Sequence, residues 1–133
     1  MNYLLDTNIC IYIIKKKPES VRQRFLKIPI GQIGISSITL AELHYGVKKS
    51  ASPEKNLEAL NQFLVPLEIY DFDFFGAMEY GDIRSGLEKM GLPIGPLDNL
   101  IAAHAKSLGF TLVTNNEKEF SRVVGLKVEN WVN

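Results

Sequence analysis

Acidic side chains stand where apolar segments of this sequence end and helical segments begin. Asp6 directly follows the apolar residues 3–5. Glu42 lies one turn into a predicted helix, and Asp98 lies at the start of another. Hard divalent cations such as Mg²⁺ prefer oxygen ligands, and one or two carboxylates are often enough to hold one. Metal ions held this way can activate water for in-line attack on a phosphodiester, so metal-assisted hydrolysis is the chemistry that these residues could perform.

A further polar cluster follows the apolar segment at residues 110–114. Asn115 and Asn116 come directly after it, and Glu119 lies one helical turn later. Because the carboxyl ends of parallel strands meet at one edge of a sheet, we expect this cluster to approach Asp6.

Helix capping is the alternative explanation for each acid taken alone. Helix N-termini favour acidic side chains, because their backbone N–H groups lack partners and the helix dipole is positive there. Thr39 and Glu42 have the spacing of a capping box, and Asn116 and Glu119 repeat that spacing. Asp6 and Asp98 could also be simple caps, so the sequence leaves both interpretations open.

Several other site types lack support in the sequence. His44 and His104 are predicted to pack or to support other residues, and Cys10 lies in an apolar run and is predicted to be core. Glycine-rich nucleotide motifs, a nucleophile elbow and a Cys/His zinc group are all absent. Fifteen basic and fifteen acidic residues give no overall excess of positive charge to indicate nucleic acid, although a local patch or a metal could still attract phosphate.

Strand-like and helix-like segments alternate along the 133 residues, which are enough for one domain over residues 1–133. This alternation predicts an α/β fold with a mostly parallel sheet covered on both faces. The apolar run at residues 9–14 is too short to span a bilayer, and one cysteine fits a reducing compartment, so we expect a soluble cytoplasmic protein. Strands are predicted at residues 3–5, 31–37, 67–73, 110–114 and 126–131, and helices at 7–16, 18–28, 38–49, 52–64, 74–90, 97–108 and 116–123.

Four segments together resemble the PIN-domain ribonucleases, and among these the VapC toxins of bacterial toxin–antitoxin pairs. They are LLDTNICIYIIKKKPESVRQRF, ISSITLAELHYGVKKS, GLPIGPLDNLIAAHAKSLG and LVTNNEKEF, in the expected order and spacing. The resemblance covers essentially the whole chain. It implies a three-layer α/β/α PIN fold and an endoribonuclease that depends on Mg²⁺ or Mn²⁺, with tRNA a frequent target.

The resemblance also assigns roles to the acids. Asp6 and Asp98 are expected to bind the metal directly, and Glu42 to bind it or to orient its water. Many PIN domains carry an Asp soon after the fourth strand, where this chain has Asn116, so Glu119 is the expected fourth acid and the number of metals stays open. Residues expected to support the ligands or to contact the scissile phosphate are Thr7, Asn8, Thr114, Asn115 and Asn116.

Partners follow from the same resemblance. It implies a VapB-type antitoxin, a homodimer and an RNA substrate. The short apolar runs of the sequence separately predict no association with a membrane. Positive charge for RNA is available at Lys15 to Lys17, at Lys48 and Lys49, and at Arg84. Lysines at helix C-termini also complement the helix dipole, so these side chains could equally be solvated helix ends.

Two other functions are compatible with parts of the sequence. A non-catalytic PIN-like module could bind RNA or a partner protein, but three mutually repelling acids would have no purpose there. A phospho-acceptor receiver domain also uses an acid at a strand end. It would need paired acids near the first strand, where this chain has only Asp6.

Overall fold

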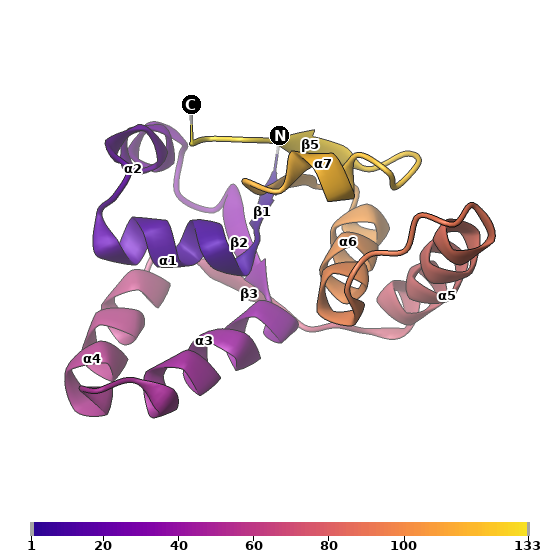
Figure 1. Cartoon of the computed structure of the whole chain (residues 1–133). Helices are drawn as coiled ribbons and strands as arrows, with labels where there is room; N and C mark the ends of the chain where they lie inside the picture. The colour runs from indigo at the N-terminus through magenta and orange to yellow at the C-terminus, as the bar shows by residue number, and fades with distance from the viewer. Residues whose placement is uncertain (1, 133) are drawn as a thin grey trace.

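The computed structural model describes residues 2–132, which form a five-stranded sheet between two layers of helices (Figure 1). All neighbouring strands are parallel, and their order is β3-β2-β1-β4-β5. Strand β1 is therefore central, and β3 and β5 are at the two edges. The strands are β1 (Tyr3–Leu5), β2 (Ile33–Ser36), β3 (Glu68–Tyr70), β4 (Thr111–Val113) and β5 (Lys127–Glu129).

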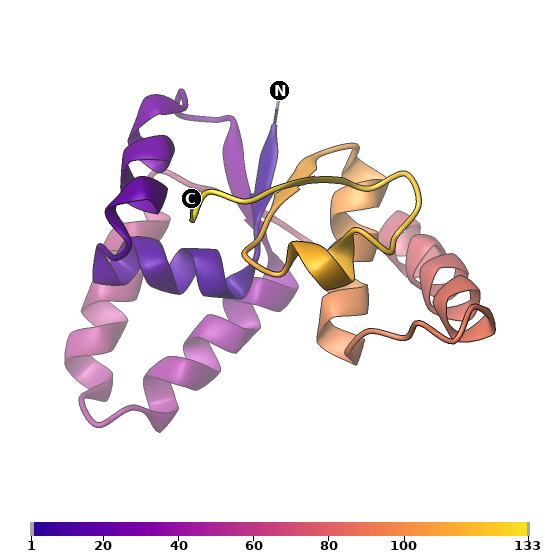
Figure 2. The ribbon, with the colours of Figure 1, turned by 45° about the horizontal axis from the view of Figure 1, so that its top comes forward.

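Seven helices connect these strands within the described residues, and the predicted three-layer α/β/α arrangement is confirmed. Figures 1 and 2 show α1 to α4 on one side of the sheet and α5 and α6 on the other. No helix in residues 2–132 combines the length and apolar character needed to cross a membrane. The helices are α1 (Thr7–Lys15), α2 (Glu19–Lys27), α3 (Ser37–Lys49), α4 (Pro53–Leu64), α5 (Phe74–Lys89), α6 (Pro96–Leu108) and α7 (Glu117–Phe120).

The central strand β1 is buried on both faces, and its side chains alternate between two cores. Tyr3 and Leu5 pack with residues of α1 to α4, whereas Leu4 packs with residues of α5 and α6. This alternation follows from the two-residue period of a strand. Asp6, the next residue, therefore lies at the end of the strand that separates the two cores.

Two backbone positions explain how local sequence determines these elements. Gly34 lies in β2 where an added Cβ would be 2.7 Å from the carbonyl oxygen of Glu68, so only glycine lets β2 and β3 approach this closely. Gly109 ends α6 with a φ of 70°, a left-handed conformation that glycine adopts without steric cost.

The start of α3 differs from the prediction. The helix begins at Ser37, and the side chain of Ser36 caps it by accepting a hydrogen bond from the backbone N–H of Ile38 at 3.0 Å. Thr39 lies buried inside the first turn, and its hydroxyl has no hydrogen-bond partner among the described residues. The predicted capping box of Thr39 and Glu42 is therefore wrong, and Glu42 is free to act elsewhere.

Candidate active site

Asp6 lies at the carboxyl end of β1 and is buried. Its Oδ1 accepts a hydrogen bond from the backbone N–H of Ile9 at 3.0 Å, so Asp6 is the N-cap of α1. Its Oδ2 accepts a hydrogen bond from the hydroxyl of Thr114 at 2.5 Å. The capping interpretation is thus confirmed for Asp6, but it accounts for only one of the two carboxylate oxygens. The second oxygen is oriented by a residue 108 positions away.

Glu42 approaches the same region from α3. The hydroxyl of Thr7 in α1 donates a hydrogen bond to its Oε1 at 2.7 Å, and the pair is partly buried. Because Thr7 directly follows Asp6, this bond brings the carboxylate of Glu42 to the end of β1. Thr7 therefore holds the carboxylate of Glu42 by a hydrogen bond.

Asp98 lies in the first turn of α6, which is capped by Gly95 and not by an acidic side chain. Among the described residues, no side chain forms a capping hydrogen bond at this helix N-terminus, so the simple capping role is wrong for Asp98. Partial burial raises the pKa of Asp98, and the neighbouring charges of Glu119 and Glu42 raise it further.

The polar cluster after β4 completes the group. The hydroxyl of Thr114 accepts a hydrogen bond from the backbone N–H of Asn116 at 3.0 Å while it donates to Asp6. The side-chain amide of Asn116 donates to Oε2 of Glu119 at 3.1 Å. Asn116 is the N-cap residue of α7, but its side chain forms no capping hydrogen bond and binds the carboxylate of Glu119 instead. The capping box suggested by the spacing of Asn116 and Glu119 is therefore wrong.

The four acids influence one another electrostatically. Burial is the largest cause that raises the pKa of Asp6 to about 6, and the charges of Asp98 and Glu42 act in the same direction. The hydrogen bonds from Thr114 and Ile9 lower it but do not offset the burial. In residues 2–132, no Lys, Arg or His forms an ion pair with any of these carboxylates.

Two of the predicted residues lie apart from the acids. Asn8 is exposed on α1. Asn115 is also exposed, and its side-chain amide donates a hydrogen bond to the hydroxyl of Tyr12 at 2.8 Å. Neither forms a hydrogen bond with the acids, but each is exposed and directly follows a threonine that does, so both lie on the rim of the group.

A buried contact between Ser36 and His104 was not foreseen. Nδ1 of His104, in α6, lies 2.7 Å from Oγ of Ser36, the cap of α3. The ring also packs edge-on against Phe72, with centroids 5.4 Å apart. Burial lowers the pKa of His104, although Asp73 and Asp71 act in the opposite direction.

This contact joins the helix of Asp98 to the helix of Glu42. A serine at a strand end is a capping signal that the sequence offered, but no local pattern links it to a histidine 68 residues away. His104 has the packing role that was predicted for it. His44 does not, because it is exposed on α3. Cys10 is buried, as predicted.

The donor set fits a hard divalent cation. It consists of carboxylate oxygens with hydroxyl and amide groups behind them, and its negative charge is uncompensated by any ion pair in the described chain. A carboxylate with a pKa of about 6 is one whose charge is poorly stabilised, and a cation would stabilise it. Among residues 2–132, no three His, Cys, Asp or Glu side chains already converge tightly enough to enclose one ion.

The fold and the site agree with one class of protein. The model of the family described as the PIN domain matches residues 3–126, nearly the whole length. A parallel three-layer fold with acids from β1, α3, α6 and α7 around one strand end accompanies that match.

Individual relatives and solved structures identify the branch of the PIN-domain family. The tRNA(fMet)-specific endonuclease VapC of Shigella flexneri is 48% identical over 131 residues, covering 98% of each chain. The crystal structure of VapBC2 from Rickettsia felis, bound to a promoter DNA fragment, includes a chain that is 49% identical with a TM-score of 0.93, over 98% of this chain and 99% of that one. The crystal structure of DNA-bound VapBC from Salmonella typhimurium includes a chain that is 46% identical with a TM-score of 0.92, over 98% of both chains. The chain belongs to the VapC branch of the PIN-domain family.

Proposed function

We propose that the chain is the toxin of a VapB–VapC pair and an endoribonuclease that hydrolyses phosphodiester bonds in RNA, with tRNA as its target class. The observation that carries this proposal is the group of Asp6, Glu42, Asp98 and Glu119 beside the end of one strand, without a neutralising basic side chain in the described chain. The relative from Shigella flexneri, named a tRNA(fMet)-specific endonuclease, supports the RNA target. The alternative of a non-catalytic module is not favoured by relatives that are named ribonucleases.

Asp6 and Asp98 would hold Mg²⁺ or Mn²⁺, with Glu42 as a further ligand or as the residue that orients water. A divalent cation bound there activates water and stabilises the charge that develops on the phosphate and the leaving oxygen. Glu119 would act as the fourth acid.

The surrounding residues keep these carboxylates in place. The Thr114 hydroxyl fixes Oδ2 of Asp6, and the Thr7 hydroxyl fixes Oε1 of Glu42. The Asn116 amide fixes Glu119. Pre-positioned acids lose little freedom when they bind a cation, which favours a site held by such hydrogen bonds.

Asn8 and Asn115 expose their amides at the rim, where they could donate hydrogen bonds to the scissile phosphate. The hydrogen bond from Asn115 to Tyr12 leaves the carbonyl oxygen and one N–H of that amide available.

We also propose a VapB-type antitoxin and a second copy of the chain as partners, acting in the cytoplasm where tRNA is found. The VapBC complexes among the related structures support the antitoxin. Phe74, Phe75 and Met78 are 70%, 65% and 56% exposed along the start of α5, and this apolar surface supports a dimer contact.

Cleavage of a total tRNA pool by protein freed of antitoxin tests the function. We expect discrete fragments with Mg²⁺ or Mn²⁺ and none with EDTA. Asp98→Asn should abolish cleavage and leave the fold intact, because Asp98 caps no helix. Asp82→Asn, which removes an exposed acid of α5, is the matched control and should cleave normally. Equal cleavage by wild type and Asp98→Asn would show that Asp98 plays no part in the reaction, and it would refute the proposal.

A further inference from the structure

The neutral net charge of the chain conceals an uneven distribution. Residues 7–64, which form α1 to α4 with β2, contain nine Lys or Arg and four Asp or Glu, a net charge of +5. Residues 65–133 contain six Lys or Arg and ten Asp or Glu, a net charge of −4. Asp6 accounts for the remaining unit, and it lies between the two parts of the chain.

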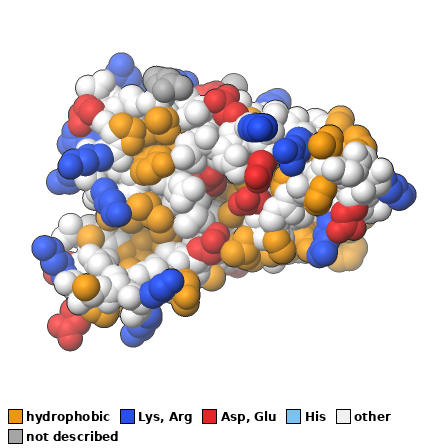
Figure 3. Space-filling view, in the orientation of Figure 1, with side chains coloured by type: hydrophobic (Ala, Val, Ile, Leu, Met, Phe, Trp, Pro, Cys, Tyr) orange, Lys and Arg blue, Asp and Glu red, His pale blue; other side chains and the backbone are white. Residues whose placement is uncertain are grey.

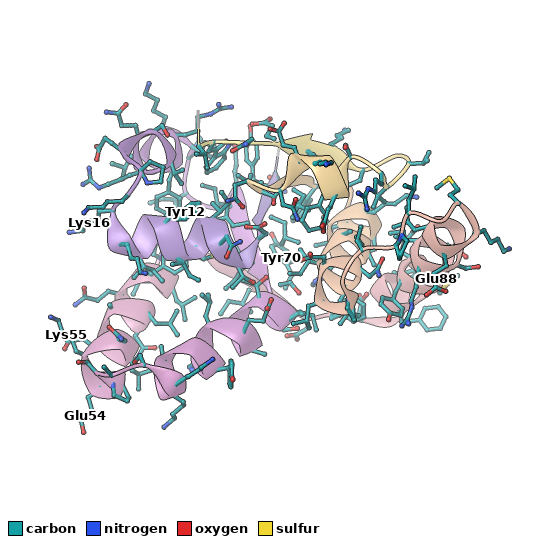
Figure 4. All side chains as sticks on the ribbon, in the orientation of Figure 1. Tyr12, Lys16, Glu54, Lys55, Tyr70 and Glu88 are labelled. Carbon is teal, nitrogen blue, oxygen red and sulfur yellow. The ribbon has the colours of Figure 1, made fainter. Side chains whose placement is uncertain are left out.

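Much of the positive charge is exposed and unpaired at the outer ends of α1, α3 and α4. Figure 3 shows Lys and Arg side chains along this side of the molecule and acidic side chains near its centre. Lys16 and Lys55 point outward, away from α5 (Figure 4). Within residues 2–132, none of these lysines forms an ion pair. We define the basic surface as Lys15, Lys16, Lys17, Lys48, Lys49 and Lys55, all of them exposed.

Arg84 does not belong to this surface. It lies on α5, where its guanidinium bonds the Glu88 carboxylate at 3.2 Å and the Tyr80 hydroxyl at 2.7 Å. Its charge is therefore already engaged, and the sequence-based grouping of Arg84 with the lysines is not supported by its position.

One lysine of the basic surface and one acid of the site line the same cleft. This cleft of about 310 Å³ between α1, α3 and α4 has mostly apolar walls, with Lys15 and Glu42 among its polar residues. Tyr45 adds an exposed aromatic ring on α3, and Nζ of Lys49 lies 5.7 Å from its centre. Aromatic rings beside cations are typical of surfaces on which unpaired bases stack and phosphates bind.

The acidic site itself repels a polyanion, because four carboxylates surround it before a cation binds. Binding energy for RNA must therefore come from positive charge nearby. The excess of such charge lies on the side of α1 to α4, whereas the side of α5 to α7 is net negative.

We propose that the RNA substrate binds across the α1 to α4 side, with its phosphates on the basic surface, and makes no comparable phosphate contacts with the α5 to α7 side. This inference rests on the proposed ribonuclease function and specifies where the substrate of that same site lies. An antitoxin segment is the competing occupant, and the net positive charge favours RNA.

Binding of a tRNA pool to Asp98→Asn protein, followed by fluorescence anisotropy in Mg²⁺ over a KCl series, tests the proposal. Lys17→Gln/Lys48→Gln removes two charges from the basic surface, and Lys89→Gln/Lys127→Gln removes two exposed charges from the other side. The first pair should weaken binding about tenfold. It should also reduce the steepness of log K plotted against log KCl concentration by about 1.5, since each lost phosphate contact reduces that slope by about 0.7 to 0.9. The second pair should bind as the parent does.

Cleavage kinetics in the otherwise wild-type chain give a second readout. The Lys17/Lys48 variant should raise KM and leave kcat unchanged, because neither lysine belongs to the acidic site. Equal losses in both double variants, or unchanged RNA binding with loss of antitoxin binding in the first, would overturn the proposed surface. Failure of the wild-type protein to cleave any RNA would instead refute the ribonuclease function, so the two failures are distinguishable.

Discussion

Asp6 should make the stability of this protein depend on pH in an unusual direction. Its pKa rises from 3.8 to about 6 on folding, mainly because the carboxylate is buried. The folded state therefore holds the proton more tightly than the unfolded state. Below about pH 3.8, Asp6 is protonated in both states and does not lower the free energy of unfolding. As the pH rises from about 3.8 towards about 6, the free energy of unfolding falls, and above about pH 6 the full destabilisation is present.

The size of this effect follows from the same two values. A rise from 3.8 to about 6 corresponds to about 3 kcal/mol, at about 1.4 kcal/mol for each pKa unit. Asp6→Asn removes the buried charge but keeps the helix cap, because an Asn oxygen can accept from the Ile9 N–H as the carboxylate does. We expect Asp6→Asn to match wild type near pH 4 and to exceed it by up to about 3 kcal/mol near pH 7.5.

Urea unfolding of both proteins in EDTA, at intervals from pH 4 to pH 8, measures this difference. Asp82→Asn removes an exposed acid and should show a difference that does not change with pH. Addition of Mg²⁺ should stabilise wild type above pH 6 and shrink the gap, because a bound cation offsets the buried charge. A gap between Asp6→Asn and wild type that is the same at pH 4 and pH 7.5 would refute the reasoning.

Three further predictions concern hydrogen bonds and backbone contacts. Thr114→Val removes the donor to Asp6 and should slow RNA cleavage about tenfold or more, with recovery in Thr114→Ser, as measured by single-turnover rates. Ser36→Ala removes both the cap of α3 and the buried contact with His104, so it should lower the free energy of unfolding by at least about 1 kcal/mol; an unchanged urea midpoint would argue against both roles. Gly34→Ala should cost about 1–3 kcal/mol because its Cβ meets a neighbouring strand, whereas Gly46→Ala, in open space on α3, should be neutral or stabilising by thermal denaturation.

The order of strands and helices was predictable because apolar periodicity and turn residues mark each element. Strands came out shorter than predicted, for example Glu68–Tyr70 in place of residues 67–73, since a strand ends where its partner ends. The same principle explains the capping-box error. Both Ser36 and Thr39 could cap a helix, and the pairing of Ser36 with Tyr70 in the neighbouring strand determines that β2 runs to Ser36 and α3 begins after it.

The gathering of the acids was predictable for a topological reason. Parallel strands bring their carboxyl ends to one edge, so Asp6 and the segment after β4 had to meet. The bond between Ser36 and His104 and that between Asn115 and Tyr12 join residues 68 and 103 positions apart. Neither pair has a local pattern, so only the packed fold could reveal them.

The central place of β1 has a consequence during translation. Its partner β4 is encoded more than a hundred residues later, yet both must pair before Thr114 can reach Asp6. A nascent chain that has left the ribosome only as far as α6 carries Asp6, Glu42 and Asp98 but neither Thr114 nor Glu119. The complete set of acids and the hydrogen bond that orients Asp6 can therefore form only after β4 and α7 have been synthesised, when most of the chain has already been made.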